Sequence, residues 1–370
     1  MTVSQQVQIY PKIFQNVGIL GPEIDHQRSL VAMLGSSAGN QTLIPDSNSY
    51  FQGRATGLTT RIERVVDQLW GTRNQDYLHY LCKLLDDAHT EAVVAYWGTN
   101  PLADLLALRL LRPHIKLVLM VLCYPLSLNY PGVARQQWMM RRAAKVLDGF
   151  IFPSIEMARF FEQTVFGKAR PAYMILPPFW PKSFQAVERA DSASNSPNLV
   201  FIGRTDLSHR TVHAGDDIRP LMRGLLDAGI ELHHVRSDET NDGHPMRHPF
   251  EPVGQSHLIE MMGRYDASLI AYNTNVCARD DRFRLTVPDR LITSVAAGVP
   301  IAIPAQGYEA SKNYLREYPA VFTFKSPQDL KQQLSDRAHV TALREAAWTA
   351  RVRYHAEGQE TRLRAFLAEV

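Results

Sequence analysis

The chain has 370 residues, of which 45% are hydrophobic and 21% are charged, and its formal net charge is +3. This is the composition of a globular protein long enough for two domains. The mild charge argues against the concentrated basic surface of a typical nucleic-acid-binding protein, and no stretch is long and apolar enough to span a bilayer.

The cysteines and the first residues bear on the cellular setting. The three cysteines, Cys82, Cys123 and Cys277, form no C-x-x-C pair, so the sequence implies neither a zinc site nor a disulfide framework. A reducing, cytoplasmic setting is therefore expected. The first residues carry no basic n-region and no apolar h-region, so no secretory signal peptide is expected.

Strand-like and helix-like segments alternate through the first half of the chain. A capping-box pattern at Thr60 and Glu63 marks the start of one helix. The expected strands are 17–20, 92–97, 116–123 and 149–152, and the expected helices are 58–69, 101–111 and 135–147. This β-α-β-α order predicts a parallel, doubly wound sheet with helices on both faces.

A boundary follows, and the alternation then restarts. The proline-rich segment 177–181 cannot continue regular structure, and the polar segment 186–198 is typical of an interdomain connector. The expected strands are then 199–203, 231–235, 267–272, 299–303 and 321–324, with helices at 218–228 and 258–264 and a helical pattern from about 329 onwards. We therefore expect a Rossmann-like domain at 1–185, a second at 186–345, and a helical tail at 346–370 that can cross back to the first.

The most informative stretch is residues 288–304, PDRLITSVAAGVPIAIP. Pro288 suits the first turn of a helix, where no backbone donor is needed. Gly298 suits the left-handed position that ends a helix. Residues 299–303 are an apolar run typical of a strand buried on both faces of a parallel sheet.

The order P-x-R-L-x-x-x-x-A-x-G-x-P-I resembles the donor-binding segment of two-domain glycosyltransferases with the GT-B fold. That segment commonly reads P-x-K-L-x-E-Y-L-A-x-G-x-P-V, so Arg290 takes the place of the lysine and Thr293 that of the glutamate. The resemblance is best from about 198 to 304. It implies an α/β protein of two Rossmann-like domains, with the ligand site in the cleft where the carboxyl ends of both sheets face each other.

The resemblance also implies which residues meet the donor diphosphate. Residues 199–204 are similar to the first strand of the donor domain, with Gly203 at the strand exit and Arg204 as the basic residue after it. The family's second basic residue corresponds to either His209 or Arg210. Fixed cations and helix N-termini stabilise the negative charge that grows on the leaving diphosphate, and they do so without a metal.

Further donor contacts are implied beyond the next strands. Phe250 either stacks on the nucleobase or packs in the core. Tyr272 ends a strand at the same edge, and the polar loop after it leads to Arg284 and Arg290, which suit an anion; the alternative is a solvated charged loop. Thr293 stands where the family's glutamate holds the ribose hydroxyls, and a hydroxyl makes only a weaker, neutral bond there.

The N-terminal half is expected to bind the acceptor. Asp25 and His26 follow the first strand, so either could take the proton of an acceptor hydroxyl; the alternative is that Asp25 caps the following helix. The helix at 135–147 combines basic residues with Trp138. It either docks on an anionic membrane or is a solvated helix with a buried stripe.

The sequence thus predicts a metal-independent glycosyltransferase that uses a UDP- or GDP-linked sugar and no other cofactor. Its acceptor would be a sugar, a lipid-linked compound or a small molecule. It would be cytoplasmic, either free or peripheral to the inner face of the membrane. The motif style favours retention of stereochemistry, whereas an inverting enzyme would need a base such as Asp25 or His26. Loss of the glutamate at Thr293 keeps two alternatives open: a non-catalytic GT-B-like binding or scaffold protein, and a GT-B sugar-nucleotide epimerase.

Overall fold

The structure is a computed structural model of the 370-residue chain. It describes residues 16–35, 41–50, 75–96, 101–125, 130–191, 194, 196–203, 215, 217–236, 243–273 and 281–370. Three parts of the sequence predictions lie outside these residues: the helix expected at 58–69, the first basic residue Arg204, and the second, His209 or Arg210.

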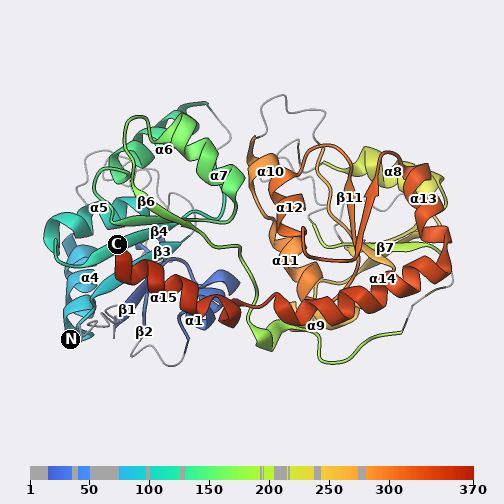
Figure 1. The fold of residues 1–370 in the computed structure, drawn as a ribbon, viewed down its shortest axis with the longest axis horizontal. Coiled ribbons are helices and arrows are strands. Elements are labelled where there is room, and N and C mark those ends of the chain that lie inside the picture. Colours follow the sequence, from blue (N-terminus) through green and yellow to red (C-terminus); the bar gives the residue numbers. More distant parts are fainter. Residues whose placement is uncertain are drawn as a thin grey trace, which may run out of the picture.

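The first half of the chain forms a six-stranded parallel sheet (Figure 1). The strands stand in the order β2-β1-β3-β4-β5-β6, and every described neighbouring pair is parallel. The bounds are β1 Val17–Leu20, β2 Gln41–Ile44, β3 Ala92–Tyr96, β4 Lys116–Met120, β5 Gly149–Phe152 and β6 Ala172–Ile175.

The second half forms another six-stranded parallel sheet, in the order β12-β11-β10-β7-β8-β9. The bounds are β7 Asn198–Phe201, β8 Glu231–Val235, β9 Arg247–Phe250, β10 Ala267–Leu269, β11 Ile301–Pro304 and β12 Val321–Phe324. Two doubly wound parallel sheets confirm the fold class predicted from the alternating pattern.

Helices cover both faces of each sheet, which gives each domain a core on either side. In the first domain these are α1 Asp25–Leu34, α2 Ser47–Tyr50, α4 Gln75–Asp87, α5 Leu102–Leu111, α6 Tyr130–Ala143, α7 Ile155–Phe160 and the π-helical turn η1 Phe161–Val165. The later helices are α8 Arg219–Asp227, α9 Gln255–Met262, α10 Asp281–Leu285, α11 Asp289–Ala296, α12 Glu309–Tyr314, α13 Pro327–Ser335, α14 Arg337–Ala350 and α15 Glu360–Glu369, with single turns η2 Lys182–Phe184, η5 Arg351–Arg353 and η6 Ala356–Gln359. Among the described residues, no helix has both the length and the apolar character needed to cross a membrane.

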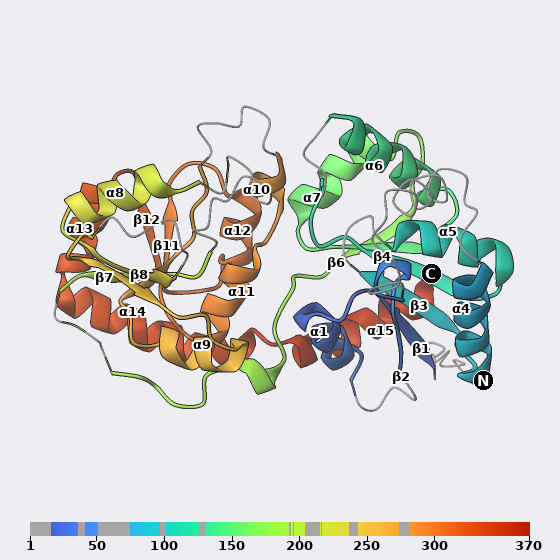
Figure 2. The same cartoon turned by 180° about the vertical axis from the view of Figure 1, so that it is seen from behind.

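The chain crosses back to the first domain near its end. In α14, Ala347 and Ala350 are buried in the core of the second sheet. In α15, Leu363 and Phe366 are buried against the first sheet instead, and α15 lies beside α1 (Figure 2). Gly149 in β5 makes this packing possible, because an added Cβ would come within 2.7 Å of the Phe366 ring. The domain boundaries expected at 185 and 345 remain predictions.

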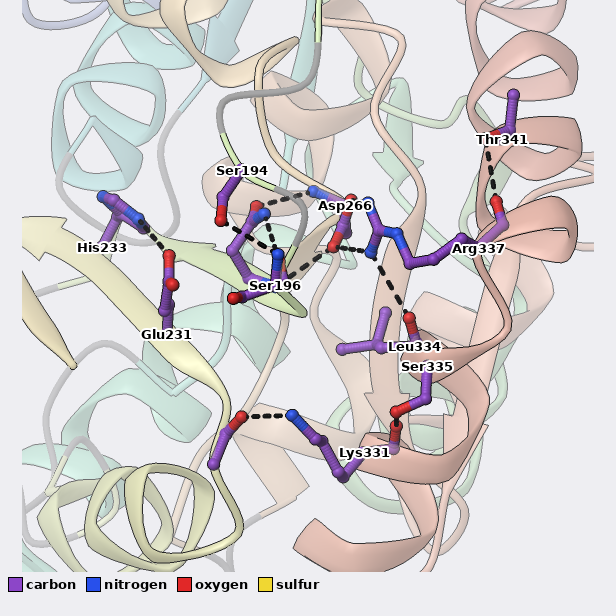
Figure 3. A network of polar contacts seen from close by, with 12 residues as sticks. Ser194, Ser196, Glu231, His233, Asp266, Lys331, Leu334, Ser335, Arg337 and Thr341 are labelled. Carbon is purple, nitrogen blue, oxygen red and sulfur yellow. Dashed lines mark hydrogen bonds and ion pairs between the residues drawn. The ribbon is translucent and has the colours of Figure 1, made fainter.

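A buried carboxylate joins α14 to the second sheet (Figure 3). The Asp266 side chain is fully buried and accepts two hydrogen bonds from Arg337, at 2.6 and 2.8 Å, and one from the Asn198 backbone N–H, at 3.1 Å. A buried carboxylate is stable only when it is paired in this way. The start of α14 is thereby held at the amino ends of β7 and β10.

Candidate functional site

The order of the second sheet creates a switch point between β7 and β10. The chain passes from β7 to β8 and β9 on one side, and then returns to β10, β11 and β12 on the other side. The connections that leave β7 and β10 therefore diverge, and in open α/β sheets ligands bind outside the carboxyl ends of the strands at such a point. Gly203 follows β7 there, and Ala271 follows β10.

The Arg290 side chain lies at this switch point. It comes from the first turn of α11, and its Nη1 donates a hydrogen bond to the Ala271 carbonyl at 3.1 Å. Its guanidinium carbon stands 4.2 Å from the centroid of the Tyr272 ring and 5.2 Å from that of Phe201. These cation–π contacts fix the orientation of the arginine.

Gly203 leaves the space that this guanidinium occupies. A Cβ at Gly203 would come within 2.7 Å of Arg290 Nη1 and within 2.3 Å of the Phe201 ring. Such distances are far shorter than a normal van der Waals contact. The glycine predicted at the strand exit therefore leaves room for the Phe201 ring as well as for Arg290.

Phe283 and Tyr308 hold in place the Tyr272 ring that contacts Arg290. Phe283 stacks on Tyr272 with 4.0 Å between ring centroids. The Tyr308 hydroxyl accepts a hydrogen bond from the Tyr272 backbone N–H at 2.7 Å. It donates another to the Tyr272 backbone carbonyl at 3.2 Å. Burial raises the pKa of Tyr308 to about 12. The Tyr272 ring is thus held against Arg290 by packing and is not itself an open stacking surface.

The first sheet has its own switch point, between β1 and β3. The Tyr96 hydroxyl at the end of β3 donates a hydrogen bond to the Pro22 carbonyl after β1. Gly21 allows this approach, because an added Cβ would stand 2.5 Å from the Tyr96 ring. Helix α1 starts beyond this point, and His26 lies in its first turn.

One hydrogen bond connects the two switch points. His26 Nε2, from the first sheet's switch point, lies 3.0 Å from Asp289 Oδ1, beside Arg290 in α11. The His26 side chain is 8% exposed and that of Asp289 is 63% exposed, so the pair opens to solvent on the aspartate side. Desolvation by the surrounding protein raises the pKa of Asp289, but His26 and then Arg290 outweigh it and hold this pKa below its usual value.

The linker between the domains adds a second connection. The Trp180 ring lies 4.9 Å from that of His26, and its Nε1 donates a hydrogen bond to Thr293 Oγ1 at 2.9 Å. Gln255, at the start of α9, donates a further bond to the same oxygen at 2.9 Å. Thr293 is only 3% exposed. We call His26, Trp180, Asp289, Arg290 and Thr293 the interdomain site.

No protein-family model and no curated protein matches the sequence, whereas solved structures match the fold. A sucrose-phosphate synthase from Thermosynechococcus elongatus aligns with a TM-score of 0.64 over 94% of this chain and 97% of its own, at 9% identity. A trehalose-6-phosphate protein from E. coli bound with UDP-2-fluoro glucose gives 0.61 over 96% and 99%, at 11% identity. Anabaena HepE in complex with UDP-glucose gives 0.61 over 96% and 100%, at 12% identity.

The chain has the GT-B fold. The alignments extend over both sheets, as the motif at 288–304 predicted. Within this GT-B chain, the motif itself forms the expected units: α11 ends at Ala296, Gly298 is left-handed with φ +64°, and β11 follows at Ile301–Pro304. Arg290 and Gly298, two positions of the motif, therefore have clear physical roles here.

Three further residues predicted for the site, Phe250, Arg284 and Asp25, lie in β9, α10 and α1. Phe250 ends β9 and is half-buried against the core on the α9 side. Arg284, in α10, is exposed. Asp25 is not the N-cap of α1, which is Ile24, and its carboxylate stands 3.8 Å from Arg28. Arg204 and Arg210 lie outside the described residues, so their place in the site stays a prediction.

The α10 segment carries a further contact between the domains. Ser154, at the start of α7, donates a hydrogen bond to the Leu285 carbonyl at 3.1 Å. The Leu285 side chain is buried with the core of the first sheet, whereas Phe283 stacks on Tyr272 of the second. Leu285 is 1% exposed, which explains why an apolar residue stands at this position.

Sequence reasoning missed Asp289, Trp180 and Gln255. The contact of Asp289 with His26 depends on the approach of two domains, which no local pattern records. Trp180 lies in the proline-rich segment 177–181, whose sequence predicted only that regular structure ends there. Gln255 had one usable signal, because it opens the helix that follows Phe250, the residue expected either to stack on the nucleobase or to pack in the core.

Proposed function

We propose that this chain is a glycosyltransferase that moves a sugar from a nucleoside-diphosphate donor to an acceptor hydroxyl. The observation that carries the proposal is the position of Arg290 at the switch point of the second sheet. The E. coli and Anabaena structures of the same fold contain UDP-2-fluoro glucose and UDP-glucose. Their ligands support a UDP-linked donor for this chain, with a GDP-linked donor as the alternative sugar nucleotide.

Arg290 suits the leaving diphosphate because of its remaining donors. Among the described residues, its guanidinium N–H groups donate only to Ala271 O, so most of its five donors stay available. A fixed guanidinium binds phosphate oxygens in a bidentate manner. It stabilises the charge that develops as the sugar–oxygen bond breaks. We propose Arg204 and Arg210 as further cations for this diphosphate, which makes the proposed transfer independent of a metal.

His26 is the proposed residue on the acceptor side. It faces the second domain and pairs with Asp289, and a histidine held by a carboxylate is a common arrangement for a general base. Asp25 points instead toward Arg28. A retaining reaction, in which a donor phosphate oxygen takes the proton, would need His26 only for positioning.

The acceptor is proposed to be a sugar, a small molecule or a lipid-linked compound, and helix α6 bears on the last of these. Tyr130 is 82% exposed and Trp138 is 44% exposed, and Arg142 lies over the Trp138 ring at 4.9 Å. Exposed aromatic and basic side chains on one helix suit the surface of an anionic bilayer. We propose that this helix allows peripheral contact with the inner face of the cytoplasmic membrane.

The test is a donor screen with the purified full chain. UDP-linked and GDP-linked sugars are incubated with candidate acceptors in the presence of EDTA, and both the released nucleoside diphosphate and the sugar products are measured. We expect release of nucleoside diphosphate from one donor class, with transfer to an acceptor. Binding without turnover would instead favour a non-catalytic protein, and conversion of the donor to an isomeric sugar nucleotide would favour an epimerase. Complete loss of activity in EDTA, restored by manganese, would contradict the metal-independent mechanism.

A further inference from the structure

Three side chains with metal-binding atoms meet on the outer strands of the second sheet. His233 in β8 and His248 in β9 are register partners, so their side chains lie on the same face of the sheet. Their rings stack with 4.6 Å between centroids. Glu231 lies two residues before His233 and therefore projects to the same face, and Figure 3 shows these two side chains pointing toward each other.

The His233 ring contains a nitrogen that lacks a hydrogen-bond partner among the described residues. Its Nε2 atom is buried, and the nearest carboxylate oxygen, from Glu231, is 4.0 Å away, beyond hydrogen-bond distance. A buried polar atom without a partner costs stability, so such an atom in a folded protein calls for an ion or a water molecule. The three potential ligand atoms of Glu231, His233 and His248 all lie within 4.8 Å of one another.

The adjacent histidine, His234, provides an internal comparison. Its side chain lies on the opposite face of β8 and is 1% exposed. Its Nδ1 bonds the Val235 carbonyl at 2.8 Å, and its Nε2 accepts a bond from Arg247 Nε at 3.0 Å. Both nitrogens of this core histidine are thus paired, whereas the neighbouring His233 keeps one nitrogen directed at Glu231 and His248.

We propose that Glu231, His233 and His248 form a binding site for a zinc ion. Two imidazole nitrogens and one carboxylate oxygen are a known zinc donor set, with water as the fourth ligand. The ligand atoms of a tetrahedral site with bonds of about 2.0–2.1 Å stand roughly 3.4 Å apart. Binding would therefore require these atoms to move closer together and the two stacked rings to rotate until their in-plane lone pairs converge on the ion. Imidazole ligands exclude a typical calcium or magnesium site, which is built from oxygen atoms.

The position of the cluster gives the ion a structural role. Among the strands that the structure describes, β9 is the last in the order and pairs only with β8, so it is an edge strand there. An ion bound by His248 from β9 and by Glu231 and His233 from β8 would join the two strands through their side chains. The cluster lies on a face of the sheet, beside Tyr265, and not in front of the carboxyl ends where Arg290 lies. The zinc site is therefore independent of the proposed transfer reaction.

Calorimetric titration of the chelator-treated full chain with zinc chloride tests the proposal. We expect one equivalent of zinc per chain. Loss of a group that merely orients a metal ligand costs about 10–100-fold in affinity, so His248→Ala and His233→Ala should each cost at least as much. His257→Ala, which removes an exposed histidine from α9, is the matched control and should bind zinc like the unmodified chain. Equal binding by all these variants would overturn the proposal.

A crystal grown with zinc chloride provides a second test that does not depend on folding of the variants. X-ray data on both sides of the zinc absorption edge should give an anomalous peak within bonding distance of His233 Nε2 and His248. A water molecule there, without an anomalous signal, would overturn the proposal. Because neither test measures sugar transfer, failure of the zinc site and failure of the proposed function are distinguishable.

Discussion

Arg290 is the residue on which the proposed chemistry depends most. Its guanidinium is held at the switch point by Ala271 and Tyr272, and it would stabilise the leaving diphosphate. Arg290→Met keeps much of the side-chain length and removes the charge. We expect turnover to fall by about 10²-fold or more, as for loss of one preorganised charge-stabilising donor, with little change in melting temperature. Steady-state kinetics with the donor found in the screen provide the measurement.

The control for Arg290→Met is Arg316→Met, because Arg316 is an exposed arginine that pairs only loosely with Glu317 at 3.9 Å. This variant should keep full turnover. If Arg290→Met also turns over UDP-linked and GDP-linked sugars at the unmodified rate, Arg290 does not belong to the donor site.

Thr293 shows what the departure from the family glutamate means physically. Its hydroxyl oxygen accepts hydrogen bonds from Trp180 and Gln255 and is buried. Thr293→Val replaces the hydroxyl by a methyl group of similar size and leaves both donors without an acceptor. Because unsatisfied buried groups cost about 1–3 kcal/mol, we expect a loss of unfolding free energy in that range, measured by urea denaturation.

Thr293→Ser is the matched variant, since it keeps the hydroxyl and removes only a methyl group. It should lose less stability than Thr293→Val. Equal or greater loss in the serine variant would show that packing of the methyl group matters more than the two hydrogen bonds.

At the scale of elements, the pair between α1 and α11 predicts a dependence on pH. The pKa of Asp289 in the folded chain lies below the ordinary value of 3.8, mainly because His26 opposes the effect of desolvation. A proton therefore binds this carboxyl more readily in the unfolded chain. The contribution of the pair to stability is fully present above the ordinary pKa and is lost as the pH falls through the lower, folded-state pKa.

Asp289→Asn removes this titration. Between about pH 5 and pH 3, the unfolding free energy of the asparagine variant should fall less steeply with acid than that of the unmodified chain. Urea denaturation at several pH values measures both slopes. Asp227→Asn, an exposed position in α8, is the control and should leave the slope unchanged. A slope in Asp289→Asn as steep as that of the unmodified chain would contradict the pairing.

Four strands have the bounds that the sequence predicted: β1, β5, β8 and β12. Of these, β1 and β5 are fully buried apolar runs between turn residues, which have few other interpretations, whereas β8 and β12 alternate buried with partly exposed positions. Strands β2, β6 and β9 were missed: each is partly exposed, and β2 and β9 also contain polar residues in place of a continuous apolar run. Helix α6 was expected at 135–147 and instead begins at Tyr130, where a proline at the second position suits the first turn.

The residues of the candidate site also differ in whether the sequence could predict them. Gly203 and Arg290 could be predicted because each belongs to a local motif, Gly203 at the end of a strand and Arg290 at the start of a helix. The pairs His26 with Asp289 and Trp180 with Thr293 join segments far apart in the chain, at 263 and 113 residues of separation. Such contacts depend on how the domains approach each other, and hydrophobic periodicity carries no information on that approach.

At the scale of the whole molecule, several contacts among the described residues join the two domains. The linker contributes Trp180, the tail places α15 on the first sheet, Ser154 bonds the Leu285 carbonyl, and the pair of His26 with Asp289 joins the switch points. These connections bring the first turn of α1 close to the first turn of α11. A donor diphosphate at Arg290 would therefore lie next to the proposed acceptor side, as transfer between two bound substrates requires.

The proposed nucleotide-sugar site is tested most directly by the melting temperature of the full chain with UDP and with GDP. A ligand at 100 times its dissociation constant adds about 2.7 kcal/mol to the unfolding free energy. We expect at least one of the two nucleotides to raise the melting temperature of the unmodified chain clearly, and to raise that of Arg290→Met much less. If neither UDP nor GDP, nor any of their sugar conjugates, changes the melting temperature at millimolar concentration, the chain has no nucleotide-sugar site and the proposed function is wrong.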